Sequence, residues 1–317
     1  MPQPTLTDIV DPVLTNILVA YMQRETMFVA TRVFPVVPVD TQTGKYYEFD
    51  INEWLLDAMQ RRAPGTESAG SGYKQSNVAY SCDVFALHKD IADQIRANHK
   101  GPLDPERNAI SWLKQMAMIR LEVQWVADYF TTSVWTTDKV GTTDFVKWSD
   151  HAGSDPKKDV RAGVSKILTD TGMMPNTFVC GWDVFAELQD HPDVKDSLKY
   201  TSSEPATPEL LARWLGVERV MVASAVKATN VEGETAATAI IAGKNALLCY
   251  AAPAPGIEVP SAGYVFQWTG VSGGLGATAA VANIRAPLLR SDRIEMEMAW
   301  DDKVVSKPLG YFFSAAV

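Results

Sequence analysis

The sequence predicts an α+β fold, and three features of the chain indicate it. A long amphipathic helix is predicted at residues 104–134, a strictly alternating strand begins at Ile294, and short helices and strands alternate between them. Apolar residues make up 46% of the 317 residues and charged residues 21%, which is ordinary for a folded protein. A chain of this length can bury a large core or form two lobes.

The first part of the chain is predicted to be extended. Residues 5–37 are expected to form an arm with a short apolar helix at residues 9–21, and Pro35 and Pro38 favour extended backbone outside the centre of a sheet. Strand-like runs at residues 45–49 and 77–87 flank a polar, glycine-rich stretch at residues 61–72. A two-stranded hairpin buries little surface by itself. We therefore expect a neighbouring molecule to complete this one.

The strongest helix signal begins at Asp104-Pro105-Glu106. Asp can cap free amide groups, Pro fits the first helical position, and Glu suits the positive end of the helix dipole. Six large apolar residues follow at spacings of four and three, and they are predicted to form the buried stripe: Trp112, Met116, Ile119, Val123, Val126 and Phe130. At 1.5 Å per residue, this spine helix would be roughly 45 Å long.

Residues 151–280 are predicted to form alternating short helices and strands, with one helix that begins at Asp155-Pro156 and ends at Gly172. Further on, one strand face is predicted to be buried and the other to carry Glu295, Glu297, Ala299 and Asp301. The buried face consists of Ile294, Met296, Met298 and Trp300. We expect this strand to turn at residues 301–303 and a last strand to follow at residues 310–313.

Charge and cysteine content restrict the function classes. The net charge of −9, from 29 basic and 38 acidic residues, does not favour nucleic-acid binding, which requires clustered cations. Cys82, Cys180 and Cys249 are far apart, which is typical of reduced, buried thiols in a cytosolic protein. We see no signal peptide or membrane span, so the protein is predicted to be soluble and intracellular where it is made.

The sequence predicts no catalytic, cofactor-binding or metal-binding site. The histidines, His88, His99, His151 and His191, lack metal-ligand spacing, and His191 is expected at the surface. Burial explains Cys82 better than a nucleophilic pairing with His88 does. Other weak matches are the glycine-rich residues 270–276, which lack the helix of a phosphate loop, and Ser154 with Lys157, which lack companion motifs.

Four stretches carry a resemblance to a known family: FPVVPVDTQTGKYY at residues 34–47, RAPGTESAGSGY at residues 62–73, YSCDVFALHKDIADQIR at residues 80–96, and residues 102–106. With them the chain resembles the major capsid proteins of tailed bacteriophages and prophages, whose fold is shared with encapsulin shells. The resemblance implies an N-terminal arm (1–37) and an extended β-hairpin loop (38–88). It also implies a peripheral domain (89–150, containing the spine helix, and 281–308) and an axial domain (151–280, with the last strand at 309–317).

The resemblance further implies a structural subunit, not an enzyme, that self-assembles as hexamers and pentamers into an icosahedral shell. The shell would enclose double-stranded DNA in the virion without strong specific binding. Assembly would take place in the bacterial host cytoplasm, and scaffolding, portal and decoration proteins are possible separate partners. Candidate inter-subunit contacts are Arg61, Arg62, Glu67 and Tyr73. Two alternatives remain open, an encapsulin-type compartment with enzyme cargo and a hydrolase whose site is assembled from distant residues.

Overall fold

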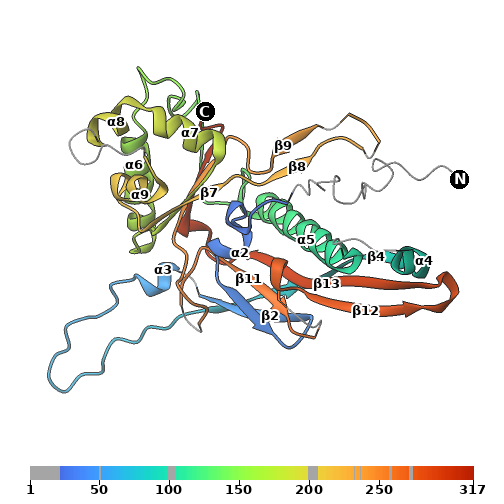
Figure 1. The fold of residues 1–317 in the computed structure, drawn as a ribbon. Coiled ribbons are helices and arrows are strands. Elements are labelled where there is room, and N and C mark those ends of the chain that lie inside the picture. The colour runs from blue at the N-terminus through green and yellow to red at the C-terminus, as the bar shows by residue number, and fades with distance from the viewer. Residues whose placement is uncertain are drawn as a thin grey trace, which may run out of the picture.

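The computed structural model describes residues 22–49, 51–98, 104–198, 206–231, 233–235, 237–256, 259–270 and 274–317. Within these residues the protein forms two lobes, each built on a five-stranded sheet (Figure 1). The helix expected at residues 9–21 lies outside the described residues. Helices and strands alternate along the chain, which confirms the predicted α+β class.

The first sheet has the strand order β1, β11, β13, β12, and β4 also pairs with β13. Its strands are β1 (Val36–Val39), β4 (Asp83–Ala92), β11 (Gly263–Trp268), β12 (Ala280–Ala286) and β13 (Ser291–Val304). β1 pairs in parallel with β11 and lies at the edge, where Pro38 can be accommodated without an N–H group.

Strand β13 carries the predicted apolar face, and the four side chains of that face are buried: Ile294, Met296, Met298 and Trp300. The predicted turn at residues 301–303 is wrong, because β11 continues to pair with β13 there and the strand ends only at Val304. Ala299, expected on the open face, is buried as well.

The spine helix is α5 (Pro105–Tyr129), which lies along the first sheet (Figure 1). It begins as predicted, since the Asp104 side chain accepts a hydrogen bond from the amide of Glu106. It ends at Tyr129 rather than at residue 134. The indole N–H of Trp135 donates to the free carbonyl of Tyr129 at this end, at 2.8 Å. With 25 residues it is about 37 Å long.

The buried stripe of α5 differs from the predicted one. Phe130 is buried, but Trp112 is 42% exposed, and the other four predicted core side chains are only partly buried: Met116, Ile119, Val123 and Val126. The most buried apolar positions on α5 are instead Ala109, Leu113, Leu121, Trp125 and Tyr129. The spacing pattern alone did not distinguish two neighbouring stripes, because α5 is apolar around more than half of its circumference.

The second sheet has the strand order β5, β14, β10, β6, β7. Its strands are β5 (Thr137–Val140), β6 (Thr177–Gly181), β7 (Arg219–Ala223), β10 (Ala246–Cys249) and β14 (Gly310–Ser314). Four helices surround it in Figure 1: α6 (Pro156–Thr171), α7 (Trp182–Asp190), α8 (Pro192–Leu198) and α9 (Pro208–Leu215).

The ends of α6 are those the sequence predicts. The Asp155 side chain accepts a hydrogen bond from the amide of Lys158, and Gly172 ends the helix in a left-handed conformation with φ of 73°. α9 is closed in the same way by Thr207 and Gly216. Asp and Thr caps and C-terminal glycines depend on residues within one turn of the helix. They can therefore be predicted without knowledge of the tertiary contacts.

Smaller elements complete the chain. Two two-stranded ladders are formed by β2 (Thr43–Phe49) with β3 (Gln75–Ser81) and by β8 (Val226–Ala228) with β9 (Thr238–Ile240). The short helices are η2 (Glu25–Met27), α2 (Ala30–Val33), α3 (Ile51–Trp54), α4 (Asp93–Asn98), η3 (Gly276–Thr278), η4 (Pro287–Leu289) and η5 (Lys307–Leu309).

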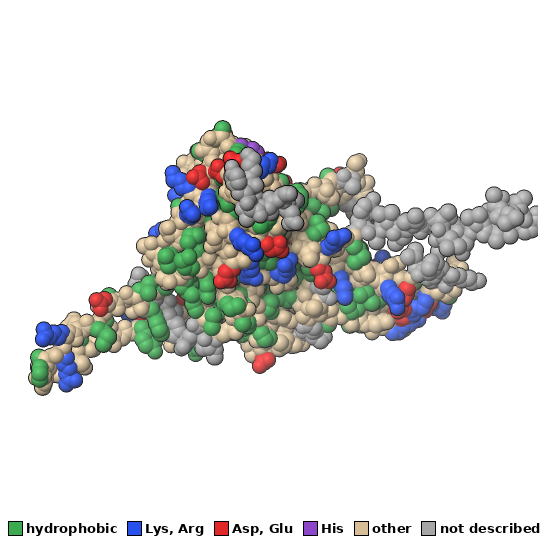
Figure 2. Space-filling model, turned by 60° about the vertical axis from the view of Figure 1, so that its left-hand side comes forward, with side chains coloured by type: hydrophobic (Ala, Val, Ile, Leu, Met, Phe, Trp, Pro, Cys, Tyr) green, Lys and Arg blue, Asp and Glu red, His purple; other side chains and the backbone are tan. Residues whose placement is uncertain are grey.

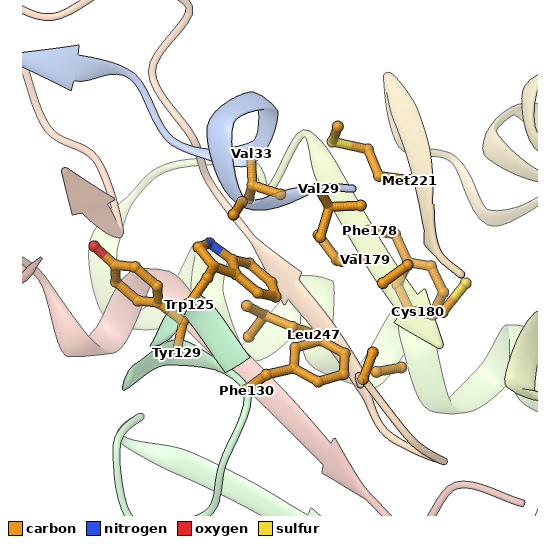
Figure 3. Packing of buried hydrophobic residues seen from close by; sticks show 14 of the residues in the cluster. Val29, Val33, Trp125, Tyr129, Phe130, Phe178, Val179, Cys180, Met221 and Leu247 are labelled. Atoms are coloured by element: carbon orange, nitrogen blue, oxygen red, sulfur yellow. The ribbon is translucent and has the colours of Figure 1, made fainter. Parts of the chain in front are cut away.

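One continuous core joins the two lobes. Figure 3 shows Trp125, Tyr129 and Phe130 of α5 beside Val29 and Val33 from the N-terminal side and beside strands of the second sheet. The second sheet contributes, among others, Phe178, Val179, Met221 and Leu247. Because these side chains form one buried cluster, the spine helix supports both sheets at once.

Candidate self-assembly surfaces

The base of the β2–β3 hairpin is anchored on its own subunit. The rings of Tyr46 and Tyr80 stack on Phe266 of β11, with centroid distances of 5.4 and 4.7 Å. The amide of Ser81 donates to the carboxylate of Asp301 at 2.8 Å. The expectation that a neighbouring molecule must complete the whole hairpin is therefore wrong for its base, which packs on the first sheet.

The segment beyond this base is different. Figure 1 shows residues 55–74 as a long loop that leaves the body of the subunit, and Figure 2 shows its end as a spur with basic side chains. Arg61, Arg62, Glu67 and Tyr73 are all exposed there. The hydrogen bonds of residues 61–72 are local, for example from the Arg62 guanidinium to the carbonyl of Thr66. The predicted contact residues thus share one spur, separate from both sheets.

Large apolar side chains are exposed at the root of this loop. The Tyr73 ring lies 5.7 Å from the ring of Trp54, and the amide of Lys74 donates to the carboxylate of Glu53, so the two strands of the loop are held together there. The exposed apolar side chains are Trp54 at 58%, Leu55 at 58%, Leu56 at 65%, Met59 at 95% and Tyr73 at 64%. Contiguous exposed apolar groups typically mark an interaction site.

A second projection extends from the opposite end of the first sheet, where β12 and β13 form a long hairpin (Figure 1). Its tip is the short helix η4, in which Leu288 is 99% exposed and Leu289 60%. Arg290 closes the tip in a left-handed conformation with φ of 45°. An apolar tip on a projecting hairpin again favours contact with another molecule.

Ion pairs stiffen this second projection next to its tip. The Arg285 guanidinium donates to Asp93 at 2.6 Å and to Asp292 at 2.8 Å. Arg96 contacts Asp292 as well, and Glu106 of α5 at 2.7 Å. The two arginines hold the pKa of the Asp292 carboxyl below its ordinary value. These bonds join β12 and β13 to α4 and α5, so the hairpin is held in one direction relative to the spine helix.

The structure also brings together a serine, a histidine and an aspartate that the sequence did not connect. The Ser154 hydroxyl lies 3.1 Å from Nε2 of His191, and Nδ1 of His191 lies 3.6 Å from Asp193. His191 is buried rather than at the surface as predicted, and burial lowers the pKa of its imidazole. The two partners are 37 residues apart, so no local signal could have paired them.

The hydrogen-bond directions in this group oppose nucleophilic catalysis. The amide of Asp193 donates to Nδ1 of His191 at 3.3 Å, so Nδ1 is an acceptor and Nε2 carries the proton. The Ser154 hydroxyl donates to the carbonyl of Asp150 at 2.7 Å and accepts from His191. A general base must accept the serine proton, whereas this imidazole donates. The arrangement serves to join α6 to α8.

The remaining chemical candidates are structural too. Cys82 is buried, and its thiol lies 3.6 Å from the carbonyl of Phe266, while His88 is exposed. Lys157 lies over the ring of Trp214 at 5.3 Å. The described residues contain no group of three or more acidic, histidine or cysteine side chains placed to hold a metal ion. Across the same part of the chain, every helix is too short or too polar to cross a membrane.

The fold is similar to those of a phage-related protein, a phage capsid protein and an encapsulin. The chain is similar over its length to a phage-related protein from Bordetella bronchiseptica, with a TM-score of 0.70, 22% identity and 93% of each chain covered. It is similar to a chain of the mature capsid of bacteriophage PhiM1 with a TM-score of 0.59 and 10% identity, over 93% of this chain and 88% of the PhiM1 chain. The similarity to the SrpI encapsulin complex of Synechococcus elongatus has a TM-score of 0.57 and 12% identity, over 99% of this chain and 96% of the encapsulin chain. This confirms the predicted capsid-type fold.

The sequence itself is similar to phage major capsid proteins. Residues 127–258 match the family described as phage major capsid protein E. The major capsid protein of Burkholderia phage BcepMu is 28% identical over 246 residues, which cover 76% of each chain. The resemblance to phage major capsid proteins that the sequence predicted is therefore confirmed.

Proposed function

We propose that the protein is the major structural subunit of a phage capsid, whose copies self-assemble into a closed icosahedral shell around the genome. The observation that supports this most strongly is the combination of a capsid-type fold over most of the chain with a 28% identical phage major capsid protein. The loop of residues 55–74 and the β12–β13 tip fit the proposal, because both expose apolar side chains that a second copy can bury.

Within this proposal, the lobe with α5 and the first sheet is the peripheral domain, and the lobe with the second sheet is the axial domain. The sheets suggest boundaries that differ from those expected from the sequence. We propose that β5, which pairs with β14, belongs to the axial domain, whereas the resemblance implied the peripheral domain for residues 137–140. We likewise propose that β11, which pairs with β13, belongs to the peripheral domain, whereas the resemblance implied the axial domain for residues 263–268.

The residues that contact neighbouring copies are proposed to be those of the loop, with Arg61 and Arg62 donating to acidic groups of the next subunit. Arginine offers a forked set of donors that suits carboxylates. The 38 acidic residues of the chain supply many possible partners in a shell of identical subunits. This proposal also includes assembly through hexamers and pentamers, a location in the virion and synthesis in the host cytoplasm. Scaffolding, portal and decoration proteins would be separate partners.

Electron microscopy and analytical ultracentrifugation of the purified protein test the main proposal. We expect closed shells or rings of subunits at high micromolar concentration, with a co-expressed scaffold where the shell needs one. A chain that sediments only as a monomer under all these conditions would contradict self-assembly.

The encapsulin-type compartment is the second candidate, and the similarity to the SrpI encapsulin favours it. The two candidates differ in what the shell contains. Particles isolated from the cells that make the protein should hold nuclease-resistant double-stranded DNA if the shell is a phage capsid. An enclosed protein cargo without DNA would instead identify a compartment.

A further inference from the structure

Residues 22–34, here called the strap, connect the spine helix to the second lobe. The main-chain amide of Gln23 donates to the side-chain oxygen of Gln115 on α5 at 3.1 Å. The side-chain amide of Gln23 pairs with both backbone groups of Val226 on β8, at 2.7 and 2.9 Å. Arg219 of β7 donates to the carbonyl of Val33 at 2.8 Å. The strap is therefore held from both lobes by polar bonds to its backbone and to Gln23.

The centre of the strap is held by a buried carboxyl group. Oε2 of Glu122 accepts hydrogen bonds from the amides of Val29 and Ala30, both at 2.9 Å. These are the amides at the start of α2, where a helix leaves its donors unpaired. Glu122 follows Gln115 by seven residues, or about two turns, so both side chains lie on the face of α5 that the strap covers.

Glu122 has no water-exposed surface, and within the described part of the chain no cation is paired with it. The whole residue is 0% exposed, and its second oxygen, Oε1, has no hydrogen-bond partner among the described residues. Val29 and Ala30 are themselves 1% and 5% exposed, so water reaches this group only if the strap moves. An ionised carboxylate in such a place is costly unless it is fully compensated.

The charged groups on the surrounding elements do not pair with Glu122 among the described residues. The elements packed against α5 are α2, η3, β4 and β13. No hydrogen bond or ion pair among the described residues joins Glu122 to any charged or titratable side chain of these elements or of α5. Those side chains are Arg32; Asp83, His88, Lys89 and Asp90; Asp292, Arg293, Glu295, Glu297, Asp301, Asp302 and Lys303; and Glu106, Arg107, Lys114, Arg120, Asp128 and Tyr129.

We propose that Glu122 is a proton-controlled latch, which holds the strap on the spine helix while its carboxyl group is protonated and favours local opening of the strap once the group is ionised. Opening lets the carboxylate reach water, which removes the cost of burying its charge. The strap makes up the last part of the expected N-terminal arm, so the latch controls how firmly the subunit holds residues 22–34.

The latch works near neutral pH. Burial raises the pKa of Glu122 from its ordinary value of 4.5 to about 7, against the opposing effect of the two backbone hydrogen bonds. In the open state the group has its ordinary pKa. The open fraction therefore increases with pH between these two values and levels off above the higher one. Linkage between these pKa values gives about a tenfold increase in opening from pH 6 to pH 8.

Hydrogen exchange of the unassembled chain tests this proposal, which does not depend on the proposed function. Exchange of peptides that contain Val29 and Ala30 is measured at pH 6 and pH 8 and corrected for the intrinsic pH dependence of amide exchange. In the wild-type protein we expect about tenfold lower protection at pH 8. Glu122→Gln keeps a carbonyl oxygen for the two amides but cannot ionise, so its protection should be the same at both pH values.

Two controls make the result decisive. Glu106→Gln removes an exposed carboxyl group from the same helix and should keep the wild-type pH dependence. Peptides from β10, which is fully buried, report global unfolding, so they should exchange more slowly than the strap at both pH values if the strap opens locally. Equal protection at pH 6 and pH 8 in the wild type, or an unchanged pH dependence in Glu122→Gln, would overturn the latch. If Glu122→Gln does not fold, the wild-type strap compared with β10 still decides the question.

Discussion

The hydroxyl group of Tyr129, in the last turn of the spine helix, donates to the carbonyl of Tyr264 on β11 at 2.8 Å. The carbonyl of Lys303 on β13 lies 3.0 Å from the same hydroxyl, and Tyr264 and Lys303 face each other in the ladder between these strands. One buried phenol thus fixes the end of the helix over two adjacent strands. The position of α5 on the first sheet depends on this contact as well as on apolar packing.

We expect Tyr129→Phe to lower the free energy of unfolding by about 1–3 kcal/mol, because two buried carbonyl groups lose a donor while the ring remains. Urea unfolding of the unassembled chain measures this change. Tyr47→Phe is the matched control, since Tyr47 is 67% exposed, and it should leave stability unchanged. Equal stability of the Tyr129 variant and the wild type would mean that the hydroxyl contributes nothing to the docking of α5.

The displaced stripe of α5 gives a second prediction. Leu121→Asp places a charge in the core without a partner and should cost several kcal/mol of stability, enough to prevent folding in many proteins. Trp112→Asp makes a similar change at a side chain that is 42% exposed, beside Lys89, and should cost little. Thermal unfolding of the two variants distinguishes the observed stripe from the predicted one. If the predicted stripe were the buried one, Trp112→Asp would be the less stable variant.

The loop of residues 55–74 should act between subunits. We expect Arg61→Glu combined with Arg62→Glu to leave the melting temperature of the unassembled chain nearly unchanged, because both side chains are exposed, and to prevent closed particles. A shell repeats each contact many times, so a loss of about 1 kcal/mol per ion pair is amplified.

A variant with lysine at both positions keeps the charge of this loop but loses the fork of donors, and it should assemble less well than the wild type. Normal particles from the double glutamate variant, seen by electron microscopy, would exclude the trans contact. A large drop in its melting temperature would instead show that the loop supports its own subunit.

Stability should depend on pH through Glu122. Its pKa is about 7 in the folded chain and 4.5 when unfolded, so its contribution is complete below pH 4.5 and is lost as pH rises to about 7. The loss amounts to about 3 kcal/mol. Burial also raises the pKa of Asp302 to about 7, so stability from this group is likewise lost as pH rises. Burial lowers the pKa of His191, so this group instead reduces stability as pH falls below 6.5.

For that reason the measurement is a difference between two proteins. Urea unfolding of the wild type and of Glu122→Gln at pH 5 and pH 8 should show a smaller pH dependence in the variant by roughly the amount given above. The slope that remains comes from other buried groups, including Asp302, Asp128, Asp159 and His191. Parallel curves for the two proteins would mean that Glu122 is not raised in pKa.

The free subunit should bind duplex DNA negligibly at physiological salt. A net charge of −9 opposes the release of counterions that drives such binding. Fluorescence anisotropy with labelled duplex DNA at about 0.15 M salt measures this directly. Submicromolar affinity would reveal a basic surface that the overall charge conceals, and would return a nucleic-acid role to consideration.

Local signals predicted much of the fold. Asp104 and Asp155 cap helices where expected, Gly172 ends one of these helices, and Ile294 to Trp300 form a buried strand face. These features depend on hydrogen bonds and periodicity within a few residues, and the sequence carries them directly. The capsid-type fold itself followed from resemblance rather than from these signals.

What the sequence did not predict depends on contacts between distant segments. Asp301 to Lys303 have the composition of a turn, but pairing with β11 keeps them in a strand. His191 is buried because α8 packs beside Ser154, and no local pattern shows this. The position of Glu122 is also visible in the sequence. It lies at helical spacing between the buried residues Met118 and Trp125 of α5. A polar residue in such a series indicates a buried partner.

Strand β13 has a consequence for how the chain is made. β4, β11 and β12 all pair with it, and β14, made later still, pairs with β5 and β10. Before residue 291 leaves the ribosome, the first sheet contains only the ladder between β1 and β11. Contacts of such long sequence separation make folding slow and leave strand edges open to wrong pairing. The first sheet therefore stays incomplete until β13 is made, and the edges of β4 and β11 that pair with β13 stay open to wrong partners for that part of synthesis.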